Sequence, residues 1–175
     1  MRPLTTAALL LLGVTALSQT VIADMGGPPP DLSPLSNLVG DWTGTGPEGK
    51  AVNVSYKLTS HGSTLVETIQ PEAGPVMTTM YHQSGKGFMM THYCALNNQP
   101  RMKTKSYKPG DKTMAFSFVD ATNVKDPKKD MHMHQLTLEF PDQDHLTQRW
   151  VSMKDGKSMP PHVFTLERVK EQKQS

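Results

Sequence analysis

The sequence predicts an all-β protein that folds as a closed antiparallel up-and-down barrel of about ten strands. Short runs rich in β-branched and aromatic residues fill most of the 175-residue chain, and turn residues separate them. No run of similar length keeps the 3.6-residue apolar period of a helix. The spacing suits a sandwich or a barrel, and because full closure of a meander removes its exposed edges, we expect the barrel.

The chain begins with the features of a secretory signal peptide over residues 1–23. A single basic residue precedes the apolar run Ala7–Leu17, which is too short for a membrane span of about 20 residues. Val21 and Ala23 occupy the small-residue positions before a cleavage site. We therefore expect a secreted or periplasmic protein that starts at Asp24. We expect no membrane anchor, because the residue directly after the cleavage point is Asp24 and not Cys, and no later segment is apolar enough to span a bilayer.

One domain should follow the signal peptide. Residues 24–37 are rich in Gly and Pro and are interpreted as a flexible leader. Residues 38–170 hold the predicted strands, and residues 171–175 form a C-terminal tail. The net charge of +2 is small and the basic residues are spread along the chain, so we expect no nucleic-acid partner.

Each predicted strand begins or ends at Gly, Pro, Asn or Asp residues typical of hairpin turns. In chain order, the predicted strands are Leu38–Thr45, Lys50–Thr59, Ser63–Gln70, Val76–Gln83, Phe88–Leu96, Arg101–Lys108, Lys112–Asp120, Met131–Phe140, His145–Met153 and His162–Lys170. The turns between them include Pro47-Glu48-Gly49, His61-Gly62, Ser84-Gly85-Lys86-Gly87, Pro109-Gly110-Asp111, Pro141-Asp142-Gln143-Asp144 and Lys154-Asp155-Gly156. The segment 121–130, between the seventh and eighth strands, is a charged solvent loop.

Alternation along each strand assigns its two faces. The faces expected to line the interior include Val52, Val54, Tyr56 and Leu58 of the second strand and Met114, Phe116 and Phe118 of the seventh.

Gly40-Asp41-Trp42 on the first strand and Arg168 near the end of the last resemble the lipocalin-like, or calycin, barrels. In those barrels a Trp of the opening strand packs under a basic residue of the closing strand, so the resemblance implies contact between Trp42 and Arg168. The segments His92-Tyr93-Cys94 and Asn98-Gln99-Pro100-Arg101-Met102 are similar to secreted bacterial lipocalin-like proteins. That likeness implies a fold without an activity.

The longer motif Gly40-Asp41-Trp42-Thr43-Gly44-Thr45-Gly46 also resembles the opening of nitrobindins. These are ten-stranded barrels that hold haem through a His near the C-terminus, and His162 is the position that matches this ligand. The resemblance implies haem as a candidate cofactor.

Two imidazoles fall on the apolar face of the eighth strand. His132 and His134 share parity with Leu136, so we expect both to line the lumen while Met131 and Met133 face outward. Buried imidazoles need partners. They could belong to a buried polar network, orient a bound small molecule, or hold a metal.

A metal site would take His132, His134, His92 and Cys94, whose imidazole and thiolate donors suit zinc or copper. Cys94 has two other roles open to it, because it could be a buried apolar filler or a reactive thiol. Whether the protein is an enzyme stays open. For Cys94 to act as a nucleophile beside His92, it would need a close, oriented base that converts it to a thiolate. Glu67 shares parity with Leu65 and Ile69, so it could face inward and titrate abnormally or pair with Arg101, or it could lie at a wet barrel end.

From these observations we expect a secreted or periplasmic barrel that binds a small, largely apolar molecule. His92, Arg101, His132 and His134 are the residues expected to fix the polar end of that ligand. The alternative is an enzyme, either metal-dependent with zinc, copper or haem iron, or thiol-based, that uses the same His and Cys residues.

Overall fold

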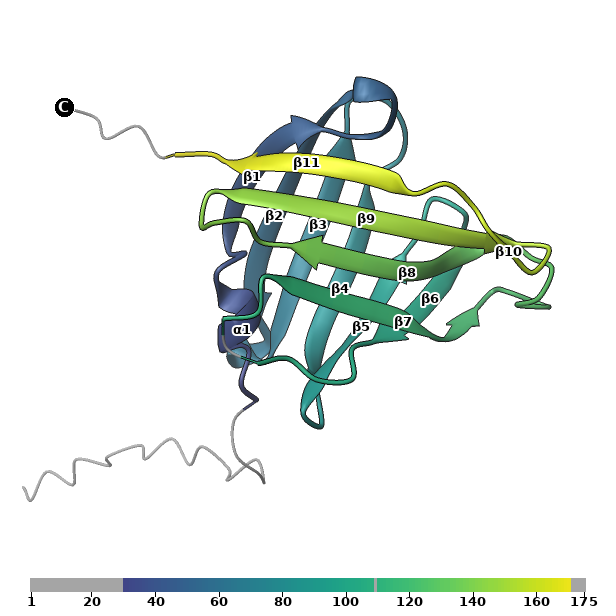
Figure 1. The fold of residues 1–175 in the computed structure, drawn as a ribbon, viewed down its shortest axis with the longest axis horizontal. Coiled ribbons are helices and arrows are strands. Elements are labelled where there is room, and N and C mark those ends of the chain that lie inside the picture. The colour runs from purple at the N-terminus through teal and green to yellow at the C-terminus, as the bar shows by residue number, and fades with distance from the viewer. Residues whose placement is uncertain (1–29, 109, 171–175) are drawn as a thin grey trace, which may run out of the picture.

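The computed structural model describes residues 30–108 and 110–170, which form a closed antiparallel barrel (Figure 1). Ten strands pair in chain order, and the ring closes because β9 pairs with both β8 and β11, while β11 pairs with β1. The elements are α1 (Ser33–Ser36), β1 (Gly40–Thr45), η1 (Pro47–Gly49), β2 (Ala51–Thr59), η2 (Ser60–Gly62), β3 (Thr64–Pro71), β4 (Met77–Ser84), β5 (Gly87–Tyr93), β6 (Gln99–Lys103), β7 (Thr113–Thr122), β8 (His132–Glu139), β9 (His145–Lys154), β10 (Lys157–Ser158) and β11 (His162–Arg168).

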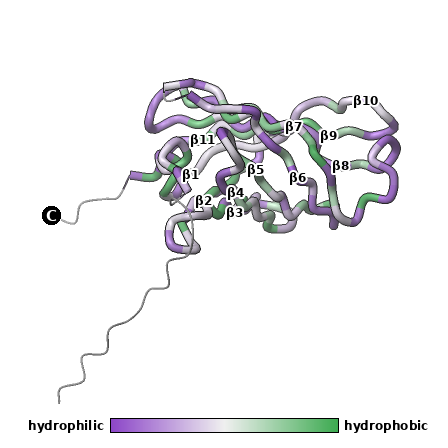
Figure 2. Tube along the Cα trace, turned by 90° about the horizontal axis from the view of Figure 1, so that it is seen from below, coloured by the Kyte–Doolittle hydropathy of each residue, from purple (hydrophilic) through white to green (hydrophobic). Residues whose placement is uncertain are grey.

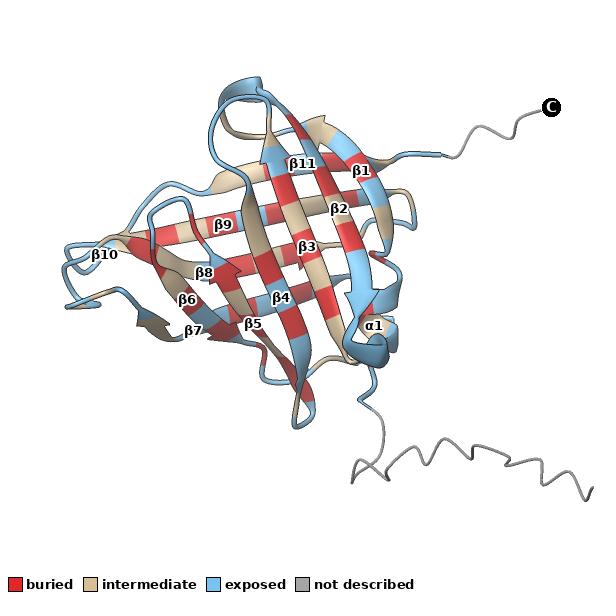
Figure 3. Ribbon diagram, turned by 180° about the vertical axis from the view of Figure 1, so that it is seen from behind, coloured by how far each residue is buried: buried red, intermediate tan, exposed pale blue. Residues whose placement is uncertain are grey.

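The fold class and all ten predicted strands are confirmed. The largest difference concerns the strand predicted over Arg101–Lys108, because β6 covers only Gln99–Lys103. The two-residue β10 lies in the turn after β9 and has no counterpart among the predicted strands. Apolar and polar residues alternate along the chain trace in Figure 2, and buried and exposed residues alternate along the strands in Figure 3.

The interior faces predicted for the second and seventh strands are confirmed in their central parts. Val52, Val54 and Tyr56 are buried, as are Met114 and Phe116. The two outermost members of these sets differ. Leu58 is exposed because it lies close to the end of β2. Phe118 is half-buried in the middle of β7, just beyond Ser117, the last residue of β7 that pairs with β8.

The described part of the expected flexible leader is folded, so that expectation is wrong over residues 31–37. Ser33–Ser36 form a short helix, and the backbone N–H of Ser33 donates to the carboxylate of Asp31. Leu32 and Leu35 are buried in the main core together with Leu38. Three leucines among the Pro residues therefore plug one end of the barrel, and this apolar burial outweighs the preference of Gly and Pro for extended chain.

The predicted contact between Trp42 and Arg168 is confirmed. The two residues are cross-strand partners of β1 and β11, and the Arg168 Cζ lies 4.2 Å from the Trp42 ring centroid. The guanidinium also donates to the carbonyls of Asn37, Val39 and Gln143. Gly40 has a φ of +126°, and a Cβ there would lie 3.2 Å from the Arg168 Nη1, so only glycine suits this position.

Two expectations fall on chain outside the described residues. These are the signal peptide at residues 1–23 and the tail at residues 171–175. Across residues 30–108 and 110–170, every helix is too short and too polar to serve as a membrane crossing.

Candidate functional site

A cavity of about 390 Å³ opens at the barrel end opposite α1. Loop segments 46–50, 71–75 and 94–96 surround its mouth, and strands β2, β3, β4, β5, β8, β9 and β11 supply its walls. Alternate connections of a meander lie at the same end of the barrel, which is why segments so far apart in the sequence meet here. The barrel is therefore plugged at one end and open at the other.

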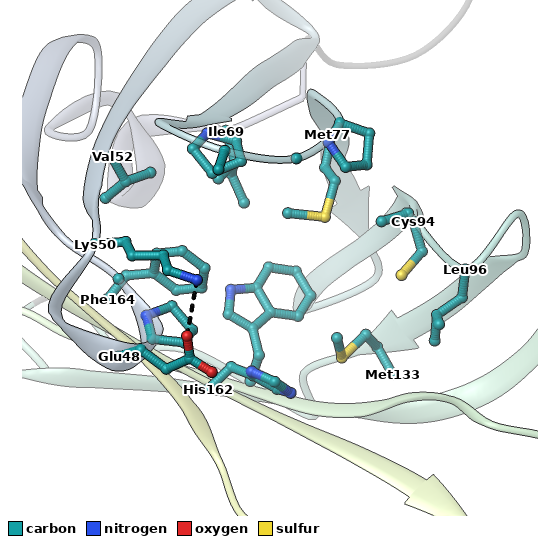
Figure 4. Close-up of a pocket in the computed structure, with 18 of the residues that line it drawn as sticks. Glu48, Lys50, Val52, Ile69, Met77, Cys94, Leu96, Met133, His162 and Phe164 are labelled. Atoms are coloured by element: carbon teal, nitrogen blue, oxygen red, sulfur yellow. Dashed lines mark ion pairs between the residues drawn. The ribbon is translucent and has the colours of Figure 1, made fainter.

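The cavity walls are mostly apolar. In Figure 4 the side chains of Met77, Cys94 and Met133 extend toward the cavity from one side, and Ile69 and Phe164 contribute apolar wall elsewhere. The charged groups drawn in this view are at the mouth, where the Lys50 Nζ lies 2.8 Å from the Glu48 carboxylate. A molecule in the cavity would meet hydrocarbon and sulfur on most of its surface.

His92 is a polar group set deep in this wall. It extends inward from β5, has 1% of its surface exposed, and its ring lies 4.4 Å from that of Trp150. Its Nδ1 is 2.9 Å from the Thr79 Oγ1. Burial lowers the pKa of His92 to about 4, so the ring is neutral at neutral pH.

A buried carboxylate lies two strands from His92 in the interior, with Thr79 between them. Glu67 on β3 is fully buried and accepts hydrogen bonds from the hydroxyls of Tyr56 at 2.6 Å and Tyr81 at 3.0 Å and from the amide of Gln148 at 2.6 Å. Burial raises the pKa of Glu67, and these hydrogen bonds act in the opposite direction. Of the alternatives left open by the sequence, the inward position of Glu67 is the one observed.

Arg101 does not reach the cavity or Glu67. Its guanidinium lies outside the barrel and pairs with the Asp120 carboxylate, and both side chains are about half exposed. The expected interior position of Arg101 is wrong because it lies between buried Pro100 and Met102 on β6, so alternation directs it outward.

A β-bulge in β8 overturns the predicted faces of its N-terminal half. The pairing with β9 shifts between Met133 and Gln135, so Met133 is opposite the buried Ser152 and His132 is opposite Met153. One extra residue reverses the parity of everything before it. Met131 and Met133, expected to face outward, therefore line the cavity, and neither His132 nor His134 does.

The two histidines form their own cluster against Phe118. His132 is fully buried and His134 is half-buried, and their rings lie 4.5 and 5.1 Å from the Phe118 ring. The His132 Nδ1 donates to the Asp130 carbonyl at 2.9 Å, and its Nε2 lies 3.2 Å from the His134 Nδ1. Of the three roles left open by the sequence, this arrangement matches a buried polar network.

The predicted metal ligands do not gather in one place. In the described part of the chain no three His, Cys, Asp or Glu side chains come close enough together to hold a metal ion. His92 and Cys94 line the cavity, but His132 and His134 lie apart from it.

Cys94 is buried and forms no disulfide, and it faces the cavity. Burial raises the pKa of its thiol, which keeps the sulfur protonated at neutral pH. A catalytic thiol needs a lowered pKa instead, so this environment does not favour the thiol-based enzyme.

His162 also lies in the cavity wall. It is half-buried at the start of β11, opposite Trp150 in the β9–β11 register. Its imidazole forms no hydrogen bond with any residue that the structure describes, so one ring nitrogen is available to a bound group.

Several wall residues were not among the predicted site residues. Trp150, Ile69, Met77 and Phe164 line the cavity, and Gln148 links Trp150 to Glu67. Alternation in β9 contains the signal for Gln148, because Leu146, Gln148 and Trp150 share the buried face. The cavity depends on the size of opposing side chains, which alternation does not describe.

Comparisons with known proteins identify the fold alone. A scan against protein-family models finds no match, and a search of curated proteins finds none with significant sequence similarity. Among solved structures, the barrel is similar to the crystal structure of Rv2717c from M. tuberculosis, with a TM-score of 0.61 and 16% sequence identity. The match covers 79% of this chain and 97% of that one, so this chain shares its barrel architecture with Rv2717c.

Proposed function

We propose that this protein binds a small, largely apolar molecule in the cavity at the open end of the barrel. The observation that carries the proposal is a cavity of about 390 Å³ with mostly apolar walls and two imidazoles, His92 and His162. Ligand sites have this composition, with an apolar lining and a few polar groups that fix orientation. An eight- to ten-stranded barrel of this kind can hold one small ligand.

The predicted signal peptide supports binding outside the cytoplasm, in the periplasm or the surrounding medium. The resemblance of Gly40-Asp41-Trp42 and Arg168 to lipocalin-like barrels supports the same function. Both points rest on the sequence, and the cavity independently supports the binding function.

N-phenyl-1-naphthylamine, an apolar dye whose fluorescence rises in apolar surroundings, tests the proposal. Wild-type protein should bind it with saturation. Met77→Trp should reduce affinity at least about tenfold, because the larger side chain fills space that Met77 now borders. Met80→Trp is the matched control, since Met80 lies on the same strand with its side chain exposed outside the barrel.

Loss of dye binding in Met77→Trp with wild-type affinity in Met80→Trp would support the cavity as the site. Equal affinity in all three proteins, or no saturable binding by wild type, would contradict the proposal. Melting curves of both variants show that each remains folded.

Haem is a second candidate ligand, favoured by the position of His162 in the cavity wall. One imidazole beside apolar walls is the donor set that haem iron takes from a proximal His. His162 would hold the haem iron through its imidazole, and Trp150 and Phe164 would supply apolar contact. Haem would supply redox and gas-binding chemistry when bound. Titration with haemin should then give a Soret band that shifts in His162→Ala and not in His82→Ala, an exposed His on β4.

A further inference from the structure

We propose that His92 is the hydrogen-bond acceptor of the cavity, and that the ligand is therefore an apolar molecule with a hydroxyl or N–H donor rather than an anion. This inference rests on the proposed function and names the class of ligand. It follows from a row of four buried polar side chains that crosses the interior of the barrel.

The row lies directly across four neighbouring strands. Tyr56 is the cross-strand partner of Glu67, Glu67 of Thr79, and Thr79 of His92. All four side chains face inward and are at most 1% exposed. The row thus begins at β2 and ends at β5, where His92 borders the cavity.

The donors around Glu67 are fixed by Trp150. An indole N–H can only donate, so its 2.8 Å hydrogen bond to Gln148 requires the amide oxygen of Gln148 to face Trp150. The amide nitrogen of Gln148 therefore faces Glu67 and donates to it. Together with two tyrosine hydroxyls, this donor stabilises the ionised form of Glu67, which can only accept hydrogen bonds.

The state of Glu67 fixes the direction of the hydrogen bonds beyond it. Thr79 lies directly opposite Glu67, and a carboxylate is a stronger acceptor than a neutral imidazole nitrogen, so we assign the single hydroxyl proton of Thr79 to Glu67. Toward His92 the Thr79 oxygen can then only accept, so the His92 Nδ1 must carry the hydrogen in the 2.9 Å contact. A neutral imidazole has one N–H, and the Nε2 of His92 is therefore left with a free lone pair.

That lone pair has access to the cavity. No described residue forms a hydrogen bond with the His92 Nε2. The fully enclosed side-chain polar atoms that lack a partner in the described chain are Asn98 Oδ1 and Ser152 Oγ, so Nε2 is not sealed in the core. It borders the open space that His92 lines.

This arrangement selects the polar group of a ligand. A neutral lone pair accepts a hydrogen bond from a hydroxyl or an N–H and offers nothing to a carboxylate. Within the described residues, the charged side chains that line the cavity, Glu48 and Lys50, pair with each other at its mouth. An apolar alcohol, phenol or amine therefore fits this site better than a fatty-acid anion.

Three compounds of the same aromatic body test the assignment by calorimetry: 2-naphthol, which carries a donor, 2-methylnaphthalene, which has none, and 2-naphthoate, an anion. The ratio of the affinity for 2-naphthol to that for 2-methylnaphthalene should be about tenfold higher in wild type than in His92→Leu, which is the effect of one buried hydrogen bond. 2-Naphthoate should bind more weakly than 2-naphthol. The variant keeps the volume of the wall and should still bind 2-methylnaphthalene.

A second measurement reads the tautomer without any ligand. The ¹⁵N NMR spectrum of wild type should show His92 protonated at Nδ1 and unprotonated at Nε2. Thr79→Val removes the oxygen that holds this tautomer, so the spectrum should change and the preference for 2-naphthol should fall, although His92 itself is intact. A His92 protonated at Nε2 in wild type would overturn the acceptor assignment.

The outcomes separate the two proposals. Equal compound preferences in wild type and His92→Leu would overturn the acceptor assignment while leaving apolar binding intact. No binding of any of the three compounds by wild type would contradict the proposed function itself.

Discussion

His92 owes its properties to residues that lie far from it in the sequence. Burial keeps its ring neutral, Thr79 fixes which nitrogen carries the hydrogen, and Glu67 fixes the hydroxyl of Thr79. Neither the His-Tyr-Cys segment nor its parity indicates this arrangement. The sequence therefore identified His92 as a candidate site residue, and the chemistry of the residue comes from three neighbouring strands.

The lowered pKa of His92 makes stability depend on pH. Between pH 6.5 and about 4, His92 binds a proton in the unfolded chain but not in the folded protein, so protonation favours unfolding. The stability associated with the neutral, buried ring is therefore fully present above pH 6.5 and is lost as the pH falls toward 4. The loss amounts to about 3 kcal/mol. The free energy of unfolding of wild type minus that of His92→Leu, measured by urea denaturation, should fall by this amount over that range.

Glu67 contributes with the opposite sign, because its raised pKa favours the folded state at low pH and this contribution is lost as the pH rises through the folded pKa. It is present in both proteins, so the difference between them isolates His92. His82→Gln, which alters an exposed His on β4, is the control. A difference that stays flat from pH 6.5 to 4 would show that His92 titrates normally.

The contact between Trp42 and Arg168 leads to a graded prediction. Trp42→Ala should cost about 3 to 5 kcal/mol, because a large buried ring is removed. Arg168→Lys should cost about 1 to 2 kcal/mol, since an ammonium cannot stack on the indole and reach three carbonyls together. Chemical denaturation measures both.

Arg149→Lys provides the comparison for Arg168→Lys. Arg149 forms an exposed ion pair with Glu139, so this substitution should change stability by less than about 0.5 kcal/mol. Equal effects of the two Arg→Lys substitutions would mean that the stacked contact contributes little.

At the scale of elements, period-2 alternation and turn residues were sufficient to predict ten strands. They failed in β8 because the bulge before Gln135 contains no Gly and no other local signal. Its position is set by β9, whose buried Ser152 and Trp150 fix the register of the opposing residues. A parity argument is reliable only until the first bulge, and here the site lies beyond it.

The segment before β1 is also more ordered than its sequence predicted. The Gly and Pro content of residues 24–37 predicted a flexible leader, but Leu32 and Leu35 are buried under the barrel. Leu35→Ala should therefore cost about 2 to 5 kcal/mol. Leu58→Ala, at an exposed Leu, should change the free energy of unfolding by less than about 0.5 kcal/mol. A similarly small effect of Leu35→Ala would contradict the plug.

At the scale of the whole molecule, the barrel has two unlike ends. One end is closed by α1 (Figure 1) and by Arg168 on Trp42, and the other opens into the cavity (Figure 4). The contact between Arg168 and Trp42 at the closed end depends on a short motif, so the resemblance to lipocalin-like barrels was sufficient to predict it. The open end depends on side-chain volumes and loops, and neither could be read from a pattern of alternation.

The central claim is that the cavity is the binding site, and methionine methyl groups report on it directly. In protein labelled with ¹³C at the Met methyls, saturating N-phenyl-1-naphthylamine should shift the NMR signals of Met77, Met131 and Met133, which line the cavity. The signals of Met80 and Met159, which are exposed elsewhere, should stay in place. Unchanged signals from the three cavity methionines at saturation, or shifts confined to Met80 and Met159, would contradict the account.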